Sequence, residues 1–167
     1  FILTQLLVMA LKGVPAFYLP ALLASENDIK NFSMTGQRRD LNREKFKSDN
    51  LLSVFNNPES NANKNLKYLR NAMDVRSELK QFNPTSEMKC LSKNRSDIVV
   101  IKRGKGPKSI FAIHNMTENK INYQLNDNDL PRIVDNDFNM QDCLASTKYN
   151  WKNIILEPFQ VIWLGSL

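Results

Sequence analysis

Cysteine, histidine, glycine and proline are all scarce in this 167-residue sequence. The two cysteines, Cys90 and Cys143, are too few for a disulfide framework and predict free thiols in a reducing compartment. The single histidine, His114, excludes a histidine-based metal cluster, and its place at the end of the run SIFAIHN predicts a surface position at a strand end. Five glycines and seven prolines exclude a collagen-like or linker-like chain. We expect a folded chain, 42% hydrophobic, without a metal or a cofactor.

A long uninterrupted hydrophobic run is also lacking. The most apolar stretch, residues 1–24, contains Lys12, Pro15 and Pro20, whereas a membrane span needs about 20 consecutive apolar residues. Neither an initiator methionine nor a basic segment precedes it, which argues against a signal peptide. We therefore expect a cytoplasmic protein without a membrane partner, and Phe1 in place of methionine predicts a piece of a longer chain.

The apolar stretch divides into two predicted elements. Residues 1–11 predict the end of a buried helix, and Gly13 is a typical stop signal for it. Residues 14–19, VPAFYL, are apolar on both faces, which is typical of a strand in a parallel sheet. A helix, a glycine and a buried strand make half of an α/β repeat.

Positive charge is concentrated in one third of the chain. The formal net charge is +6, and residues 64–108 carry twelve basic against four acidic residues. No run there reaches five consecutive like charges, and basic residues do not alternate with aromatic ones as in single-strand binding surfaces. The pattern favours a solvated basic face, and we expect no nucleic-acid partner.

The middle of the chain is polar and weakly periodic. Residues 20–62 predict a long loop after the strand, and loops at the carboxyl ends of parallel strands build active sites. This loop contains the polar cluster TGQRRDLNR, residues 35–43. Arg39 and Arg43 either present a guanidinium to an anion or form an Arg–Asp network that orders the loop.

A helix and then a β-rich region follow the loop. Residues 64–82 predict a helix with one apolar stripe at 68, 72, 75, 79 and 82 and a second at 66, 69 and 73. Two stripes predict that it packs between two layers. From about residue 86 short apolar runs predict antiparallel strands, with a hairpin turn at 104–107. Five aspartates at 127, 129, 135, 137 and 142 lack the spacing of a calcium loop and predict a polar loop.

The order of these motifs resembles the C-terminal end of enzymes of glycoside hydrolase family 13, the alpha-amylase superfamily. Within that family it resembles the subgroup of sucrose phosphorylases and glucosylglycerate phosphorylases. The resemblance covers essentially all 167 residues. The residues that carry it are Gly13, Pro15 and Tyr18 in the strand; Asn27, Asp28, Thr35, Gly36, Arg39, Leu41, Asn42 and Arg43 in the loop; and Ile154, Leu156, Pro158–Gln160, Trp163 and Leu164 near the end.

The resemblance implies a fold class of α/β plus all-β in two parts. Residues 1–82 would be the last helix, strand and helix of a TIM (β/α)8 barrel, and residues 83–167 a small antiparallel β-sandwich domain. The family's catalytic carboxylates would precede Phe1, so none is assigned here, and the chain alone is expected to be inactive.

The resemblance further implies a parent enzyme that transfers a glucosyl unit to inorganic phosphate with retention. Its partners would be a small sugar substrate and phosphate, and Arg39 would lie at the acceptor site. Two alternatives stay open, which are another amylase-type or amylosucrase-type enzyme and a non-catalytic carbohydrate-binding or interaction domain.

Overall fold

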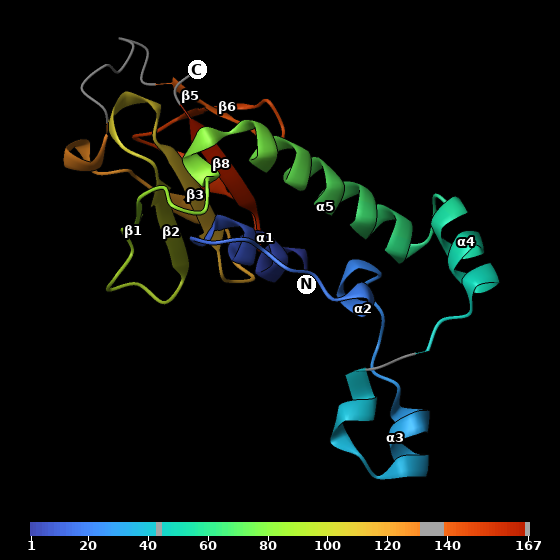
Figure 1. Cartoon of the computed structure of the whole chain (residues 1–167). Helices are drawn as coiled ribbons and strands as arrows, with labels where there is room; N and C mark the ends of the chain where they lie inside the picture. Colours follow the sequence, from blue (N-terminus) through green and yellow to red (C-terminus); the bar gives the residue numbers. More distant parts are fainter. Residues whose placement is uncertain (43–44, 131–138, 166–167) are drawn as a thin grey trace. The chain divides into compact units, whose positions relative to one another are not determined.

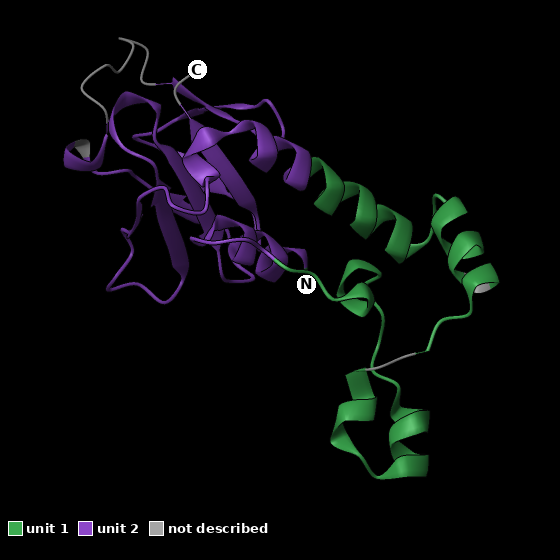
Figure 2. Ribbon diagram, in the orientation of Figure 1, with its two compact units in different colours: residues 1, 16–71 green, residues 2–15, 72–167 purple. Residues whose placement is uncertain are grey.

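The computed structural model describes residues 1–42, 45–130 and 139–165. The chain forms two compact units, which Figure 2 colours separately: one of residues 1 and 16–71, the other of residues 2–15 and 72–167. The first unit is helical in its described part, whereas the second contains strands together with the first helix (Figure 1). The prediction of a mixed α/β chain with antiparallel strands is confirmed.

Short helices, rather than the predicted long irregular loop, form in the described part of residues 20–62. That prediction was wrong because local capping signals act within the polar segment. Asp28 caps the N-terminal end of α3 through its side chain, and Gly36, at φ +65°, ends it. The helices are α1 (Ile2–Ala10), α2 (Leu19–Leu22), α3 (Ile29–Thr35), α4 (Ser48–Asn56) and α5 (Asn61–Glu78), with 3₁₀ turns η1 (Arg38–Asn42), η2 (Lys80–Phe82), η3 (Gly106–Lys108) and η4 (Asp127–Asp129).

The described strands form two antiparallel sheets. One has six strands in the order β1-β2-β3-β8-β5-β6, and the other pairs β4 with β7. The hairpin predicted at 104–107 is confirmed: it joins β2 to β3, with Gly104 and Gly106 at positive φ. The strands are β1 (Met88–Cys90), β2 (Ile98–Arg103), β3 (Ile110–Asn115), β4 (Ile121–Tyr123), β5 (Asn139–Asp142), β6 (Lys148–Asn150), β7 (Ile154–Leu156) and β8 (Val161–Gly165).

One face of the large sheet forms the main hydrophobic core. Val100 on β2 lies opposite Ile113 on β3, which lies opposite Ile162 on β8, so side chains of three strands meet on the same face. Fully buried Ile154 and Leu156 of β7 belong to the same cluster. The small sheet therefore contributes to the core of the large one.

The opposite face of the same strands is buried too. It carries Arg103 on β2, His114 on β3 and Trp163 on β8, all fully buried. Phe82 packs on Trp163 with ring centroids 4.7 Å apart, and α1 lies against β3 (Figure 1). The helix predicted over residues 1–11 is thus confirmed, and it packs on the sheet.

The strand predicted over residues 14–19 is absent. Residues 14–18 form neither helix nor strand, and α2 begins at Leu19. A parallel strand needs neighbours to bind its N–H and C=O groups, and no described strand pairs with this segment. The apolar side chains for which the sequence predicts burial are partly exposed, and Val14 is 80% exposed.

The helix predicted over 64–82 is confirmed as α5 followed by η2, but its burial differs. The buried positions are Ala62, Asn65, Leu69 and Ala72, whereas Tyr68 of the first stripe is exposed. At 3.6 residues per turn these positions form one face of the helix. Leu69 of the second stripe and Ala72 of the first both lie on this face, and Leu66, Met73 and Val75 are partly buried on either side of it.

His114 occupies the interior and not the predicted surface position. It is fully buried because β3 is a central strand whose two faces are both covered. Its Nδ1 lies 3.4 Å from the Val99 carbonyl oxygen, and burial lowers its pKa to about 4. The imidazole is accordingly neutral at pH 7.

No helix in the described ranges combines the length and the apolar character that crossing a membrane requires.

Candidate functional site

The polar segment 27–42 folds into the helix α3 and the 3₁₀ turn η1, which hydrogen bonds join to each other. The Asp28 carboxylate accepts a hydrogen bond from the Asn31 N–H at 2.9 Å, which starts α3. The Asp28 N–H donates to the Leu41 carbonyl at 2.7 Å, so the beginning of α3 is tied to η1. The Gly36 N–H donates to the Phe32 carbonyl at 2.8 Å and ends the helix. This local geometry orders the turn that carries Arg39.

Arg39 presents an accessible guanidinium on η1. Its side chain is 66% exposed, and its Nε lies 3.9 Å from Oδ1 of Asp40. An exposed ion pair of this length contributes little to stability, so Asp40 does not hold the guanidinium of Arg39 strongly. The extended Arg–Asp network that the sequence also allowed is not formed by the described residues, and Arg43 lies outside them.

A hollow of about 640 Å³ opens beside the start of α3. Its walls carry both signs of charge, and Arg39 is not among the described residues that line it. The hollow therefore does not by itself indicate one class of ligand. Its lining consists of Glu26, Asn27, Asp28, Ile29, Lys30, Asn31, Met34 and Lys45.

Two polar side chains of α5 fix the neighbouring segments of the first unit. The Asn65 amide donates to the Leu22 carbonyl at 2.7 Å and to the Ala21 carbonyl at 3.3 Å, which satisfies the end of α2. The Asn63 side chain donates to the Phe55 carbonyl in α4. The short helices on both sides of the polar segment are thus attached to one longer helix.

The C-terminal motif residues have structural contacts. The Gln160 side chain accepts a hydrogen bond from the Glu157 N–H at 2.8 Å and donates to the Tyr149 hydroxyl at 3.0 Å. Trp163 is fully buried against Phe82. These contacts give Gln160 and Trp163 a structural role in the second unit.

The aspartates predicted to lie in a polar loop do not gather. Asp129 pairs with Lys89 at 2.8 Å, whereas the Asp142 carboxylate accepts from the Trp163 N–H at 2.8 Å and the Leu144 N–H at 3.1 Å. Burial raises the pKa of Asp142, and these hydrogen bonds oppose that rise. Asp135 and Asp137 lie outside the described residues.

Sequence reasoning missed two arginines of the second unit. Arg76 and Arg103 donate hydrogen bonds to backbone carbonyls at the end of α1. Their partners lie far away along the chain, so no local spacing or motif signals the contact. Only the packing of α1 on the sheet brings them together.

The curated proteins that are similar to this chain include two glucosylglycerate phosphorylases. A glucosylglycerate phosphorylase from Allomeiothermus silvanus is 26% identical over 164 residues, which is 98% of this chain and 26% of that protein. A second, from Escherichia coli, is 21% identical over 98% of this chain and 28% of its own length. The chain is similar to part of these two glucosylglycerate phosphorylases. It spans about a quarter of the length of these curated relatives, and no protein-family model matches it.

Solved structures share the fold of this chain. A trehalose-6-phosphate hydrolase from Bacillus licheniformis superposes with a TM-score of 0.70 at 14% identity, over 99% of this chain and 38% of that one. An Anoxybacillus alpha-amylase superposes with a TM-score of 0.66 at 15% identity, over 98% of this chain and 32% of that one. The predicted resemblance to family 13 is confirmed.

Proposed function

We propose that the chain is the C-terminal portion of a retaining glucoside phosphorylase, which transfers a glucosyl unit from a small glucoside to inorganic phosphate. The observation that carries the proposal is the similarity to glucosylglycerate phosphorylases along 98% of the chain, including the polar segment around Arg39. Residues 1–82 would complete the catalytic barrel, and residues 83–167 would form the β-sandwich domain that follows it.

The proposed reaction explains why a cation is useful in this segment. In a retaining mechanism one carboxylate attacks the anomeric carbon while the second carboxyl group protonates the departing aglycone, and an acceptor oxygen then displaces the enzyme carboxylate from the glucosyl ester. Phosphate is an anion that must approach a site built from carboxylates, so a guanidinium nearby offsets the repulsion. Arg39, whose exposed side chain has its Nε 3.9 Å from Oδ1 of Asp40, is the residue that we assign to this role.

The barrel assignment also accounts for segment 14–18, which pairs with no described strand. In a barrel this segment would be the eighth strand, with a partner on each side. Those partners would come from other parts of the parent enzyme, together with the catalytic carboxylates. The apolar, exposed residues Val14 and Tyr18 would then become buried.

The proposal is tested with the full-length protein that contains this chain. We expect it to release glucose 1-phosphate from glucosylglycerate when phosphate is present. The 167-residue chain alone should release none, because the reaction needs two carboxylates at fixed separation. Release of free glucose at equal rates with and without phosphate would replace the proposal by a hydrolase, which the fold shared with a hydrolase and an amylase also permits.

A further inference from the structure

Two arginines converge on the C-terminal end of α1. Arg103, fully buried, donates from Nη1 to the carbonyls of Ala10 at 3.0 Å and Leu11 at 2.6 Å. Arg76 donates from Nε to the Met9 carbonyl at 3.0 Å and from Nη2 to the Gly13 carbonyl at 2.9 Å. Four carbonyls at the helix end are thus bound by two guanidiniums that come from α5 and β2.

Phe82 joins the two guanidiniums to the sheet. Its ring centre lies 5.8 Å from Cζ of Arg76 and 5.5 Å from Cζ of Arg103, at distances typical of cation–π contacts. The ring also packs on Trp163 of β8. A third contact of Arg103, from Nη2 to the Asn83 carbonyl at 3.0 Å, fixes the segment after Phe82. We name this arrangement of Arg76, Phe82 and Arg103 the arginine clamp.

The chemistry of the clamp matches a helix C-terminus. The last carbonyls of a helix have no partner within it and carry a partial negative charge. Neither arginine forms an ion pair with a carboxylate in the described part of the chain. Burial lowers the pKa of both groups, so each charge is held at an energetic cost that only the carbonyls and the ring offset.

The clamp acts where the chain leaves the β unit. Gly13 adopts φ +116°, a conformation that a side chain disfavours although a Cβ there would meet nothing within 4 Å. Leu6, Met9 and Ala10 are buried on the inner side of the helix, while the clamp holds its end. Helix packing and the clamp together fix the backbone at the point where residues 14–18 begin.

We propose that Arg76 and Arg103 are positioning residues for the glucosyl-transfer site. By binding the end of α1, the clamp fixes the start of segment 14–18. This inference rests on the proposed function, in which segment 14–18 is the eighth barrel strand. The β domain would then serve to align the active site as well as to stabilise the protein.

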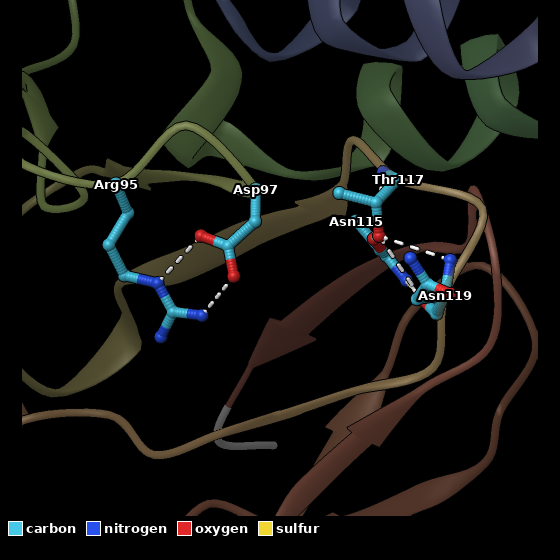
Figure 3. Close-up of polar contacts among 5 residues, drawn as sticks. All are labelled: Arg95, Asp97, Asn115, Thr117 and Asn119. Carbon is cyan, nitrogen blue, oxygen red and sulfur yellow. Dashed lines mark hydrogen bonds and ion pairs between the residues drawn. The ribbon is translucent and has the colours of Figure 1, made fainter.

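The test uses Arg76→Met and Arg103→Met in the full-length protein, with Arg95→Met as a matched control. Arg95 lies on the same unit but forms a surface ion pair with Asp97 (Figure 3). We expect kcat for phosphorolysis per folded molecule to fall about ten-fold in the clamp variants, because a displacement of about 1 Å is costly for catalysis. KM for phosphate should stay within about two-fold, since the clamp does not touch the acceptor.

Lysine variants add a second readout. Arg76→Lys should recover only part of kcat, because one ammonium cannot bind two carbonyls in the planar geometry of a guanidinium. Assays well below the melting temperature separate positioning from stability. If Arg103→Met does not fold, Arg76→Met decides, since its side chain is only partly buried. An unchanged kcat in the folded clamp variants would overturn the inference.

Hydrogen exchange separates this inference from the proposed function. In the clamp variants the amides of residues 5–13 should exchange about ten-fold faster, while those of residues 111–113 in β3 keep their protection. Equal changes in both segments, or none, would overturn the clamp. A wild-type protein without phosphorolysis would overturn the proposed function, and the exchange pattern would still decide whether the clamp holds α1.

Discussion

The guanidinium of Arg39 and the imidazole of His114 differ strongly in their exposure to solvent. Arg39 lies on a short exposed turn whose backbone is ordered by Asp28 and Gly36. His114 lies between two covered faces of a central strand. The first side chain is exposed to solvent, whereas the second is enclosed in the protein interior.

Arg39→Ala in the full-length protein should weaken phosphate use more than glucosyl-enzyme formation. One charge-assisted contact to an anion is worth about 1.5–3 kcal/mol, or roughly ten- to a hundred-fold in rate. The measurement compares kcat/KM for phosphorolysis with the rate of donor hydrolysis. Arg38→Ala, an exposed neighbour on the same turn, is the control. Equal losses in both reactions of the Arg39 variant would discard the acceptor-site role.

His114 should make the chain less stable in acid. Its pKa is about 4 in the folded chain and about 6.5 in the unfolded chain. The unfolded chain therefore binds the proton first, so stability is full above pH 6.5 and falls as the pH drops toward 4. The loss amounts to roughly 3 kcal/mol.

Urea unfolding of the wild type and of His114→Gln at several pH values measures this loss. The glutamine variant keeps a polar side chain of similar reach but has no proton to gain. Its free energy of unfolding should depend less on pH between 7 and 4 than that of the wild type. Parallel pH curves for the two proteins would show that His114 does not titrate as its burial predicts.

At the scale of elements, the side chain of Ser60 caps the N-terminal end of α5. The Asn63 N–H donates to the Ser60 hydroxyl at 3.1 Å, and this hydroxyl also donates to the Val54 carbonyl at 2.7 Å, near the end of α4. One serine thus serves two helix ends. Sequence periodicity located the helix, but the start lies three residues before the predicted one because Ser60 provides the cap.

Ser60→Ala should destabilise the first turn of α5 by about 1 kcal/mol, the usual cost of losing a cap. The amide of Asn63 should then exchange several-fold faster with solvent. Ser77→Ala, near the other end of α5, is the control because its hydroxyl bonds only the local Asp74 carbonyl. No difference between the two variants in exchange at Asn63 would contradict the capping role.

At the scale of the whole chain, burial is uneven between the two units. Among the described residues of the first unit, the buried hydrophobic side chains are Leu23, Ala62 and Leu69. The second unit has a contiguous core on one face of its sheet and α1 on the other. A region with few buried apolar contacts opens at low free energy.

Limited trypsin digestion of the 167-residue chain should therefore cut first between Lys30 and Lys47. Lys30, Arg38, Lys45 and Lys47 are exposed there, in short helices and connecting segments. Mass spectrometry of the early products should show residues 98–115 intact. First cuts after Lys102 or Arg103 would contradict the expected order of stability.

The sequence by itself determined the local elements and the resemblance to family 13. The stop at Gly13, the helix that contains residues 64–78, the hairpin at 104–107 and the strands around 98–101, 110–113 and 121–123 follow from periodicity and turn chemistry, which act between near neighbours. The family resemblance rested on ordered motifs such as Asn27-Asp28 and Arg39, and the known relatives bear it out.

Only the tertiary structure decided which faces are buried and which distant groups meet. The sequence predicts a surface position for His114, which is wrong because a strand end gives no local sign that both faces of the sheet will be covered. The run VPAFYL predicts a strand, but residues 14–18 form none, because a strand must pair with a partner that can be remote in sequence. The contacts of Arg76 and Arg103 with the end of α1 are likewise long-range. They depend on how the elements pack, and the spacing of neighbouring residues does not predict that packing.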